Sequence, residues 1–284
     1  MSKIALVTDS TAWIPRDLLT QYNITVAPQV LIWGDQTFND GVDIQPQEFY
    51  ARIKTAKVMP TTSQVPIPTM QSIFSGLLDK GFDVLGIFIS SKLSGTIQSA
   101  IQGREALSQG KERVHVVDSL STAMAMGFQV LSAARAVADG ANMADAKAVV
   151  EKARVNSGVY FAVDTLEFLH RGGRIGGAQR LIGTALNMKP VLAVLDGRVE
   201  AVERIRTKGK AQERLIELVN EQVKGKSNIR IATLHANAEA EAKSLLEKVT
   251  QQTGAVESIL TEVSPVVGTH AGPGTVGLAY IAGL

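Results

Sequence analysis

Residues 84–96 read VLGIFISSKLSGT, and they combine a strand, a polar loop and the start of a helix. The apolar run 84–89 predicts a buried β-strand, because it is short and uninterrupted. Hydroxyl residues follow it, and Gly95 and Thr96 open a predicted helix that extends to Leu107. A strand, a polar loop and a helix in this order are typical of a parallel α/β sheet, which binds ligands beyond the carboxyl ends of its strands.

The same order recurs through the first half of the chain. Short apolar runs at 4–7, 24–33 and 114–117 predict further strands. Helices are predicted between them, one with Pro15 in its first turn and one that begins at Pro46. We therefore expect an α/β fold whose N-terminal domain, residues 1–156, contains a Rossmann-like parallel sheet.

The second half has a different order of predicted helices and strands. A helical stretch from 121 to 156, broken at 140–142, is predicted to join the two halves. After it we expect a helix that follows the glycines of 172–177 and reaches about Asn187, and a β-hairpin whose turn is Asp196-Gly197. Further strands are predicted at 159–163, 191–195, 199–205, 229–234 and, as the last strand, near 259–267. A hairpin mixed with helices indicates an α+β C-terminal domain, residues 157–284.

Composition excludes several classes of function. The 284 residues hold 29 Lys and Arg against 27 Asp and Glu, a net charge of +2, which does not favour nucleic-acid binding. The absence of cysteine excludes disulfides, a thiol nucleophile and Cys-ligated metals. No apolar run approaches the ~20 residues that a membrane span needs. The first residues do not resemble a signal peptide, so we expect a cytoplasmic protein without stable membrane insertion.

Three polar clusters are candidates for a binding site. They are residues 61–64 between two prolines, residues 90–96, and residues 269–275, which we expect to open a short helix after the last strand. Their hydroxyls, backbone N–H groups and one histidine suit a carboxylate or phosphate oxygen better than a metal ion. Each cluster alone is also compatible with ordinary helix caps and turns.

Other motifs favour neither nucleotides nor metals. Residues 272–277 fit a dinucleotide-binding pattern, but only seven residues follow, too few for the returning strand and acidic residue. The chain has no phosphate-binding loop of the Walker type. Its four histidines are far apart in sequence, which argues against a histidine metal site. Asp9 and Asp118 each follow a predicted strand, where they could bind Mg²⁺ or, as we expect, cap helices. Arg171 and Arg174 could clamp a phosphate, face a partner or form a basic surface turn.

The motifs resemble those of the DegV family of bacterial fatty-acid-binding proteins. The matching segments occur in family order and span nearly the whole chain. They are TDST at 8–11, PTTSQ at 60–64, SSKLSGT at 90–96, VDS at 117–119, RGGRI at 171–175 and HAGPG at 270–274.

The resemblance implies a long-chain fatty acid buried between and within the two domains, with no metal and no other cofactor. The hydroxyls of Thr62 and Ser94 would hold the carboxylate, and Thr61, His270 and Arg171 would complete the head-group network. One departure is Val65, where the family pattern leads us to expect proline, so the loop after residue 64 could differ locally.

The resemblance also implies a partner. The protein would be a carrier without catalytic residues that presents the carboxylate to a separate ATP-dependent fatty acid kinase. The lack of a nucleotide motif agrees with this role. The alternative is a small-molecule phosphotransfer component similar to dihydroxyacetone kinase, in which His270 would bond the substrate covalently.

Overall fold

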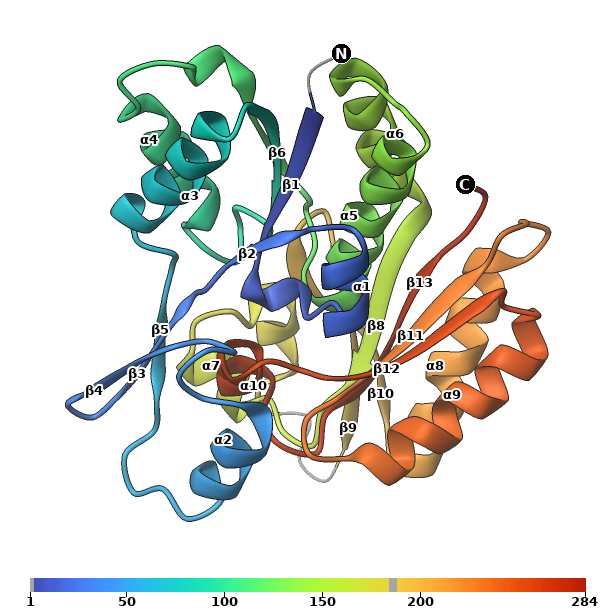
Figure 1. Cartoon of the computed structure of the whole chain (residues 1–284). Coiled ribbons are helices and arrows are strands. Elements are labelled where there is room, and N and C mark those ends of the chain that lie inside the picture. The colour runs from blue at the N-terminus through green and yellow to red at the C-terminus, as the bar shows by residue number, and fades with distance from the viewer. Residues whose placement is uncertain (1–2, 184–187) are drawn as a thin grey trace.

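The parallel sheet expected in the first half is present. The computed structural model describes residues 3–183 and 188–284. Four parallel strands lie in the order β2-β1-β6-β7 (Figure 1). Their bounds are Lys3–Asp9 for β1, Thr25–Ala27 for β2, Phe82–Phe88 for β6 and Val114–Asp118 for β7. The strand predicted at 84–89 is therefore confirmed.

Helices cover both faces of this sheet. Helices α3 (Ile67–Asp79) and α4 (Thr96–Glu105) pack on the face that carries Val84 and Phe88. On the other face, Leu85 and Ile87 join a core that includes residues of α5 (Ala123–Ala138) and α6 (Met143–Asn156). Successive residues of a strand point to opposite faces, so the uninterrupted apolar run reflects burial on both.

The second sheet contains six strands in the order β10-β9-β8-β13-β11-β12. Neighbours are antiparallel except β11 and β12, which are parallel. The strands are β8 (Ser157–Ala162), β9 (Lys189–Leu195), β10 (Arg198–Ile205), β11 (Arg230–His235), β12 (Glu257–Glu262) and β13 (Val276–Ile281). The predicted hairpin is confirmed: Asp196 and Gly197 both have positive φ, as the tight turn between β9 and β10 requires.

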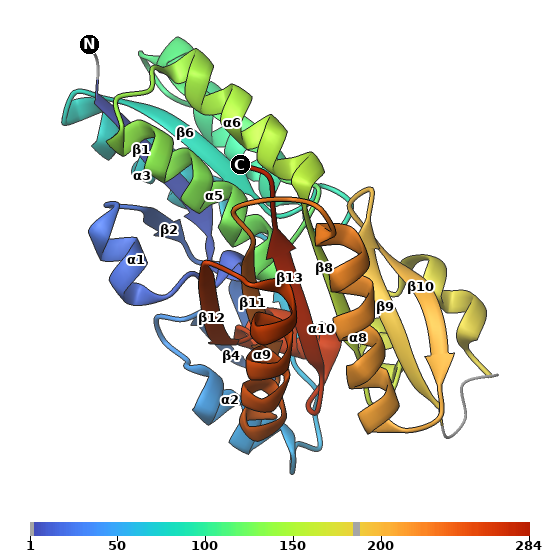
Figure 2. The same ribbon diagram turned by 90° about the vertical axis from the view of Figure 1, so that its right-hand side faces the viewer.

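The two sheets share their core. Helices α8 (Lys208–Val223) and α9 (Glu239–Thr253) pack on the outer face of the six-stranded sheet, and α5 contacts its inner side (Figure 2). Buried residues from β1, β6, α5, β11 and β13 form one continuous cluster. The chain is thus a mixed α/β protein. The boundary between domains 1–156 and 157–284 stays a prediction.

The strand expected at 24–33 is wrong as a single element. It divides into β2 and β3 (Val30–Trp33), and β3 leaves the parallel sheet to pair with β4 (Gln36–Asn39) and β5 (Thr61–Ser63). All pairing in this three-stranded sheet is antiparallel. Pro28 lies at the division and has no N–H to donate to a ladder, which favours the break.

The strand expected near 259–267 is present as β12, but its expected end and its place as the last strand are wrong. Strand β12 ends at Glu262, and helix α10 runs from Pro265 to Ala271. Ser264 caps α10 by accepting the Val267 N–H at 3.2 Å, and Pro265 occupies the first helical position, where its missing N–H costs nothing. The true last strand is β13, so the cluster 269–275 ends a helix instead of opening one.

The remaining elements are short. The last two glycines of 172–177 begin a 3₁₀ helix that ends at Leu181, so the longer helix expected there is wrong within the described residues. Its expected end near Asn187 lies outside them. The other elements are 3₁₀ helices Ser10–Ala12, Lys111–Arg113 and Gly176–Leu181 with helices α1 (Arg16–Gln21), α2 (Pro46–Ile53) and α7 (Glu167–Arg171). None of the helices in the described residues has the length and hydropathy to cross a bilayer.

Candidate functional site

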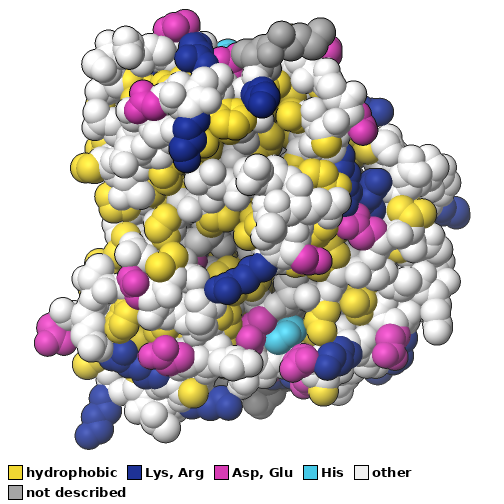
Figure 3. Space-filling model, viewed as in Figure 1, with side chains coloured by type: hydrophobic (Ala, Val, Ile, Leu, Met, Phe, Trp, Pro, Cys, Tyr) yellow, Lys and Arg dark blue, Asp and Glu magenta, His cyan; other side chains and the backbone are white. Residues whose placement is uncertain are grey.

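A largely apolar cavity of about 220 Å³ lies beside strand β5, helix α10 and the inner face of the six-stranded sheet. The space-filling view shows the molecule hollowed near the middle of one face, with hydrophobic side chains around the hollow (Figure 3). The apolar lining of the cavity comes from both halves of the chain. The residues are Ile89, Leu93, Ala123, Val159, Phe161, Leu169, Val194, Val199, Leu234, Val263, Val266, Val267 and Ala271.

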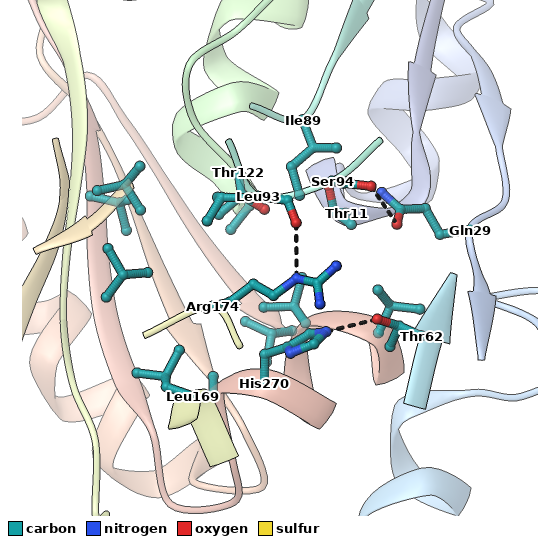
Figure 4. Close-up of a pocket in the computed structure, with 18 of the residues that line it drawn as sticks. Thr11, Gln29, Thr62, Ile89, Leu93, Ser94, Thr122, Leu169, Arg174 and His270 are labelled. Atoms are coloured by element: carbon teal, nitrogen blue, oxygen red, sulfur yellow. Dashed lines mark hydrogen bonds between the residues drawn. The ribbon is translucent and has the colours of Figure 1, made fainter. Parts of the chain in front are cut away.

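The polar lining combines hydroxyl and amide side chains with one guanidinium and one imidazole. Thr62, Ser94 and Gln29 lie together at one side of the cavity, and Arg174 and His270 lie near its centre (Figure 4). They come from five separate segments of the chain. An apolar chamber with convergent polar groups at one end is the usual form of a site for an amphipathic ligand.

Thr62 and His270 are in direct contact. The Oγ1 atom of Thr62 on β5 lies 2.7 Å from Nε2 of His270, in the last turn of α10 (Figure 4). Burial lowers the pKa of His270 to about 4, with a smaller contribution from the nearby charge of Arg174. The imidazole is therefore neutral at pH 7 and can share one hydrogen bond with the hydroxyl.

The imidazole is held tightly on its other side. A Cβ atom at Gly172 would lie only 2.0 Å from His270 Nδ1, so this position needs glycine. The Nδ1 atom is buried and has no hydrogen-bond partner among the described residues. The ring is thus fixed between the backbone of residue 172 and the Thr62 hydroxyl.

Ser94 precedes helix α4 and is bonded to the first turn. Its Oγ accepts the N–H of Thr96 at 3.3 Å and lies 3.0 Å from Thr96 Oγ1. It also donates to Oε1 of Gln29 at 3.5 Å, a long hydrogen bond. The serine is therefore set by the helix N-terminus, with its hydroxyl beside the cavity.

Arg174 is the cationic group of this cavity. It is half-buried, and of the Lys and Arg residues it alone belongs to the lining. Its Nε donates to the Leu93 carbonyl at 3.1 Å and its Nη1 donates to the Gly172 carbonyl at 2.8 Å. Within residues 3–183 and 188–284 no carboxylate forms an ion pair with it. The positive charge is therefore available to an anionic ligand.

The structure brings Thr62, Ser94 and His270 to one cavity, but not Thr61 and Arg171. Those two residues line a neighbouring hollow of about 260 Å³, whose wall also includes Thr62, Arg174 and His270. The Arg171 side chain is 48% exposed and pairs with Glu167, one helical turn earlier. Arg174 thus lines the main cavity and Arg171 does not, and the role of Arg171 stays a prediction.

Sequence reasoning missed Gln29 and left Arg174 undecided between a clamp and a surface turn. Gln29 is the polar member of an apolar run that was interpreted as one strand, and its polarity was the available signal. Burial makes that signal meaningful, because the residue is only 2% exposed and its side chain must find partners inside.

Asp9 caps the 3₁₀ helix Ser10–Ala12, as expected, whereas the expectation for Asp118 is wrong: it accepts backbone N–H groups in the turn after β7, and the N-cap of α5 is Thr122. Asp9 accepts the Thr11 N–H at 3.0 Å and the Ile89 N–H at 2.7 Å, and Asp118 accepts the Leu120 N–H at 2.9 Å. Burial raises the pKa of Asp9, while these hydrogen bonds oppose the shift. No group of three or more His, Cys, Asp or Glu side chains suited to a metal ion occurs in the described part of the chain.

Comparison with known proteins identifies the family. The model described as "Uncharacterised protein, DegV family" matches residues 3–283. The chain belongs to the DegV family. A DegV domain-containing protein of Clostridium perfringens is 32% identical to it, over 98% of each chain.

Solved structures agree with this membership. A DegV family protein from Thermus thermophilus, described for its fatty acid binding, superposes with a TM-score of 0.93 at 35% identity, over 99% of this chain and 100% of that one. DegV of Bacillus subtilis, described as a fatty acid binding protein, gives 0.90 at 33% identity with the same coverage. The resemblance inferred from the sequence motifs is confirmed.

The departure at Val65 has a structural counterpart in this DegV chain. Val65 is fully buried, and its N–H points to Thr96 Oγ1 at 3.4 Å. Proline has no N–H, so it could not make this contact. Valine at this position therefore links the segment after β5 to the start of α4.

Proposed function

We propose that this DegV family protein binds one long-chain fatty acid non-covalently in the cavity, between and within its two domains. The aliphatic lining would enclose the acyl tail, and Thr62, Ser94 and Arg174 would bind the carboxylate, with neutral His270 orienting Thr62. The observation that carries the proposal is Arg174, a cation without a carboxylate partner in the described chain that lines a largely apolar cavity.

The energetics agree with an acyl tail in the aliphatic lining and a carboxylate at the polar side chains. Each buried methylene contributes about 0.8 kcal/mol, so the tail would supply most of the affinity, less the entropy lost on association. A carboxylate removed from water costs several kcal/mol unless it is paired and hydrogen-bonded. One guanidinium and two hydroxyls would offset that cost, and they would fix the orientation of the ligand.

The finer part of the proposal is a carrier role in the cytoplasm. The chain would present the bound carboxylate to a separate ATP-dependent fatty acid kinase, which would form the acyl phosphate. Two features support this: the sequence lacks a nucleotide-binding motif, and the hollow lined by Thr61 and Arg171 shares Thr62 and His270 with the tail cavity.

Mass spectrometry of an organic extract, with native mass before and after extraction, tests the ligand class. We expect one fatty acid per chain, and its mass reports the chain length. A protein that is empty and also fails to bind added palmitate and oleate would refute the proposal. In a separate assay, protein with ATP, Mg²⁺ and palmitate should form no acyl phosphate until the kinase is added.

The alternative enzymatic role for His270 gains no support from the geometry. Its Nε2 is occupied by Thr62, and its Nδ1 faces the Gly172 backbone too closely for a substrate carbon to approach. A hydroxyketone adduct seen by intact mass, and lost in His270→Ala, would reverse this assessment.

A further inference from the structure

We propose that Gln29 is a positioning residue that sets the hydroxyl hydrogen of Ser94 toward the ligand head group, and this inference rests on the fatty-acid proposal. Gln29 lies between β2 and β3, lines the cavity and is 2% exposed. Its side chain connects Ser94 to the buried carboxyl group of Asp9 (Figure 4 shows Gln29 beside Ser94).

The orientation of the Gln29 amide follows from its partners. Its nitrogen lies 3.2 Å from Oδ1 of Asp9. That oxygen also accepts the backbone N–H of Thr11 at 3.0 Å and the Thr11 hydroxyl at 2.5 Å, so it is an acceptor. The amide must therefore present its NH₂ group to Asp9 and its carbonyl oxygen to Ser94.

Two hydrogen-bond arrangements are open to the Ser94 hydroxyl. Thr96 donates its backbone N–H to Ser94 Oγ, and the two hydroxyl oxygens lie 3.0 Å apart, so either hydroxyl can donate to the other. Gln29 Oε1 is a second acceptor for the Ser94 hydrogen, on the side of the cavity. When the Ser94 hydrogen points to Gln29, the Thr96 hydroxyl donates to Ser94 Oγ and both lone pairs of Ser94 are used, so Gln29 favours the arrangement in which Ser94 is a donor toward the cavity.

The length of the last contact explains why the hydrogen remains available. At 3.5 Å the bond from Ser94 to Gln29 Oε1 is at the weak limit, so a carboxylate oxygen in the cavity would replace it with a shorter, charge-assisted bond. Gln29 thereby keeps the Ser94 hydroxyl a hydrogen-bond donor on the side of the cavity. It does so without placing a competing positive charge or a second donor beside Ser94.

Binding of two C16 ligands tests this role: palmitate, and 1-hexadecanol, which has the same tail without the charged carboxylate. In Gln29→Met we expect palmitate to bind five- to twentyfold more weakly and hexadecanol to change less than twofold. The matched control is Gln71→Met, because the Gln71 amide donates to the Ala106 carbonyl away from the cavity. That variant should bind both ligands normally.

A double-mutant cycle separates positioning from a structural effect. In a Ser94→Ala background, Gln29→Met should cause no further loss of palmitate binding, because the hydrogen that Gln29 orients is gone. Equal losses for both ligands, or additive losses in the cycle, would overturn the inference. If Gln29→Met does not fold, Gln29→Asn provides the same contrast, because its amide is one methylene shorter and cannot reach Ser94: palmitate binding should again be five- to twentyfold weaker, with hexadecanol binding retained.

Failure of this inference is distinct from failure of the proposed function. Wild-type protein that binds palmitate, with variants that follow the additive pattern, would keep the fatty-acid site and reject the role of Gln29. Wild-type protein that binds neither C16 ligand would reject both.

Discussion

At the scale of single residues, the site combines one cation with uncharged hydrogen-bonding groups. Arg174 carries the charge, whereas Thr62, Ser94 and His270 are neutral at pH 7. Arg174 forms no ion pair with a carboxylate of the described chain, so no ion pair has to break before an anionic ligand binds to it. The donors of the site are fixed by neighbours, which reduces the entropy lost when a ligand binds.

The two hydroxyls are the first residues to test. Ser94→Ala and Thr62→Ala should each weaken palmitate binding by about 1–3 kcal/mol if a carboxylate oxygen is left unpaired. Isothermal titration calorimetry with lipid-free protein measures this. Unchanged affinity and unchanged phosphorylation by the kinase in the double variant would reject both residues as head-group ligands.

His270 predicts a pH dependence of stability. Its pKa is about 4 in the folded chain and near 6.5 when unfolded, so the unfolded state binds the proton more tightly. The free energy of unfolding should therefore fall as pH drops from about 7 toward 4, by roughly 2–3 kcal/mol from this group. Urea unfolding of wild type and His270→Gln across this range measures it, and the variant should lose less. Asp40, whose pKa burial raises to about 6, acts in the opposite direction in both proteins and cancels in the comparison.

At the scale of elements, the site depends on the meeting of β5 and α10. Pairing of Thr62 with Leu31 on β3 positions one partner, and the capped start of α10 positions His270 at its end. The Asp40 carboxyl group accepts the Val266 N–H at 3.3 Å and the Ser10 hydroxyl at 2.6 Å, which ties α10 to the segment after β1. The two elements are 208 residues apart at the Thr62–His270 contact.

The contact between α7 and α10 can be tested at Gly172. A methyl group there would meet His270 Nδ1, so Gly172→Ala should displace the ring, weaken palmitate binding and lower stability by about 1–3 kcal/mol. Gly209→Ala in α8 is the control, because its Cβ would meet nothing within 4 Å. Thermal unfolding and palmitate titration compare the two; equal behaviour would show that the ring moves without cost.

At the scale of the whole molecule, the cavity joins the two sheets. Its lining takes Ile89 from the end of the parallel sheet and Val159, Val194 and Leu234 from the six-stranded sheet. A ligand that fills it contacts both halves of the chain. Binding should therefore stabilise the molecule as one unit.

Ligand removal tests this expectation. Lipid-free protein should unfold at a lower temperature, and palmitate at 100 times its Kd should restore about 2.7 kcal/mol. Hydrogen exchange should slow in both β5 and α10 when palmitate is added. Protection confined to one half of the chain would mean that the ligand does not bridge the sheets.

Much of this protein follows from the sequence alone. The apolar runs, the break at 140–142 and the Asp196-Gly197 turn are local signals, and they predicted the parallel sheet, the helices on either side of the break and the hairpin correctly. The DegV motifs identified the family because several short strings occur in order along one chain. Thr62, Ser94 and His270 were named by the same route, and the structure brings them to one cavity, while their role stays a prediction.

The tertiary structure decided what local signals cannot express. Periodicity does not say that β3 pairs with β5 instead of extending the parallel sheet, or that β13 enters the middle of the second sheet, because pairing depends on distant partners. The same limit applies to Arg171 and Arg174, which are three residues apart and chemically identical. Only packing turns Arg174 toward Leu93 and the cavity and leaves Arg171 beside Glu167 at the surface. Likewise, the role proposed for Gln29 depends on its burial against Asp9, which lies 20 positions away in the sequence.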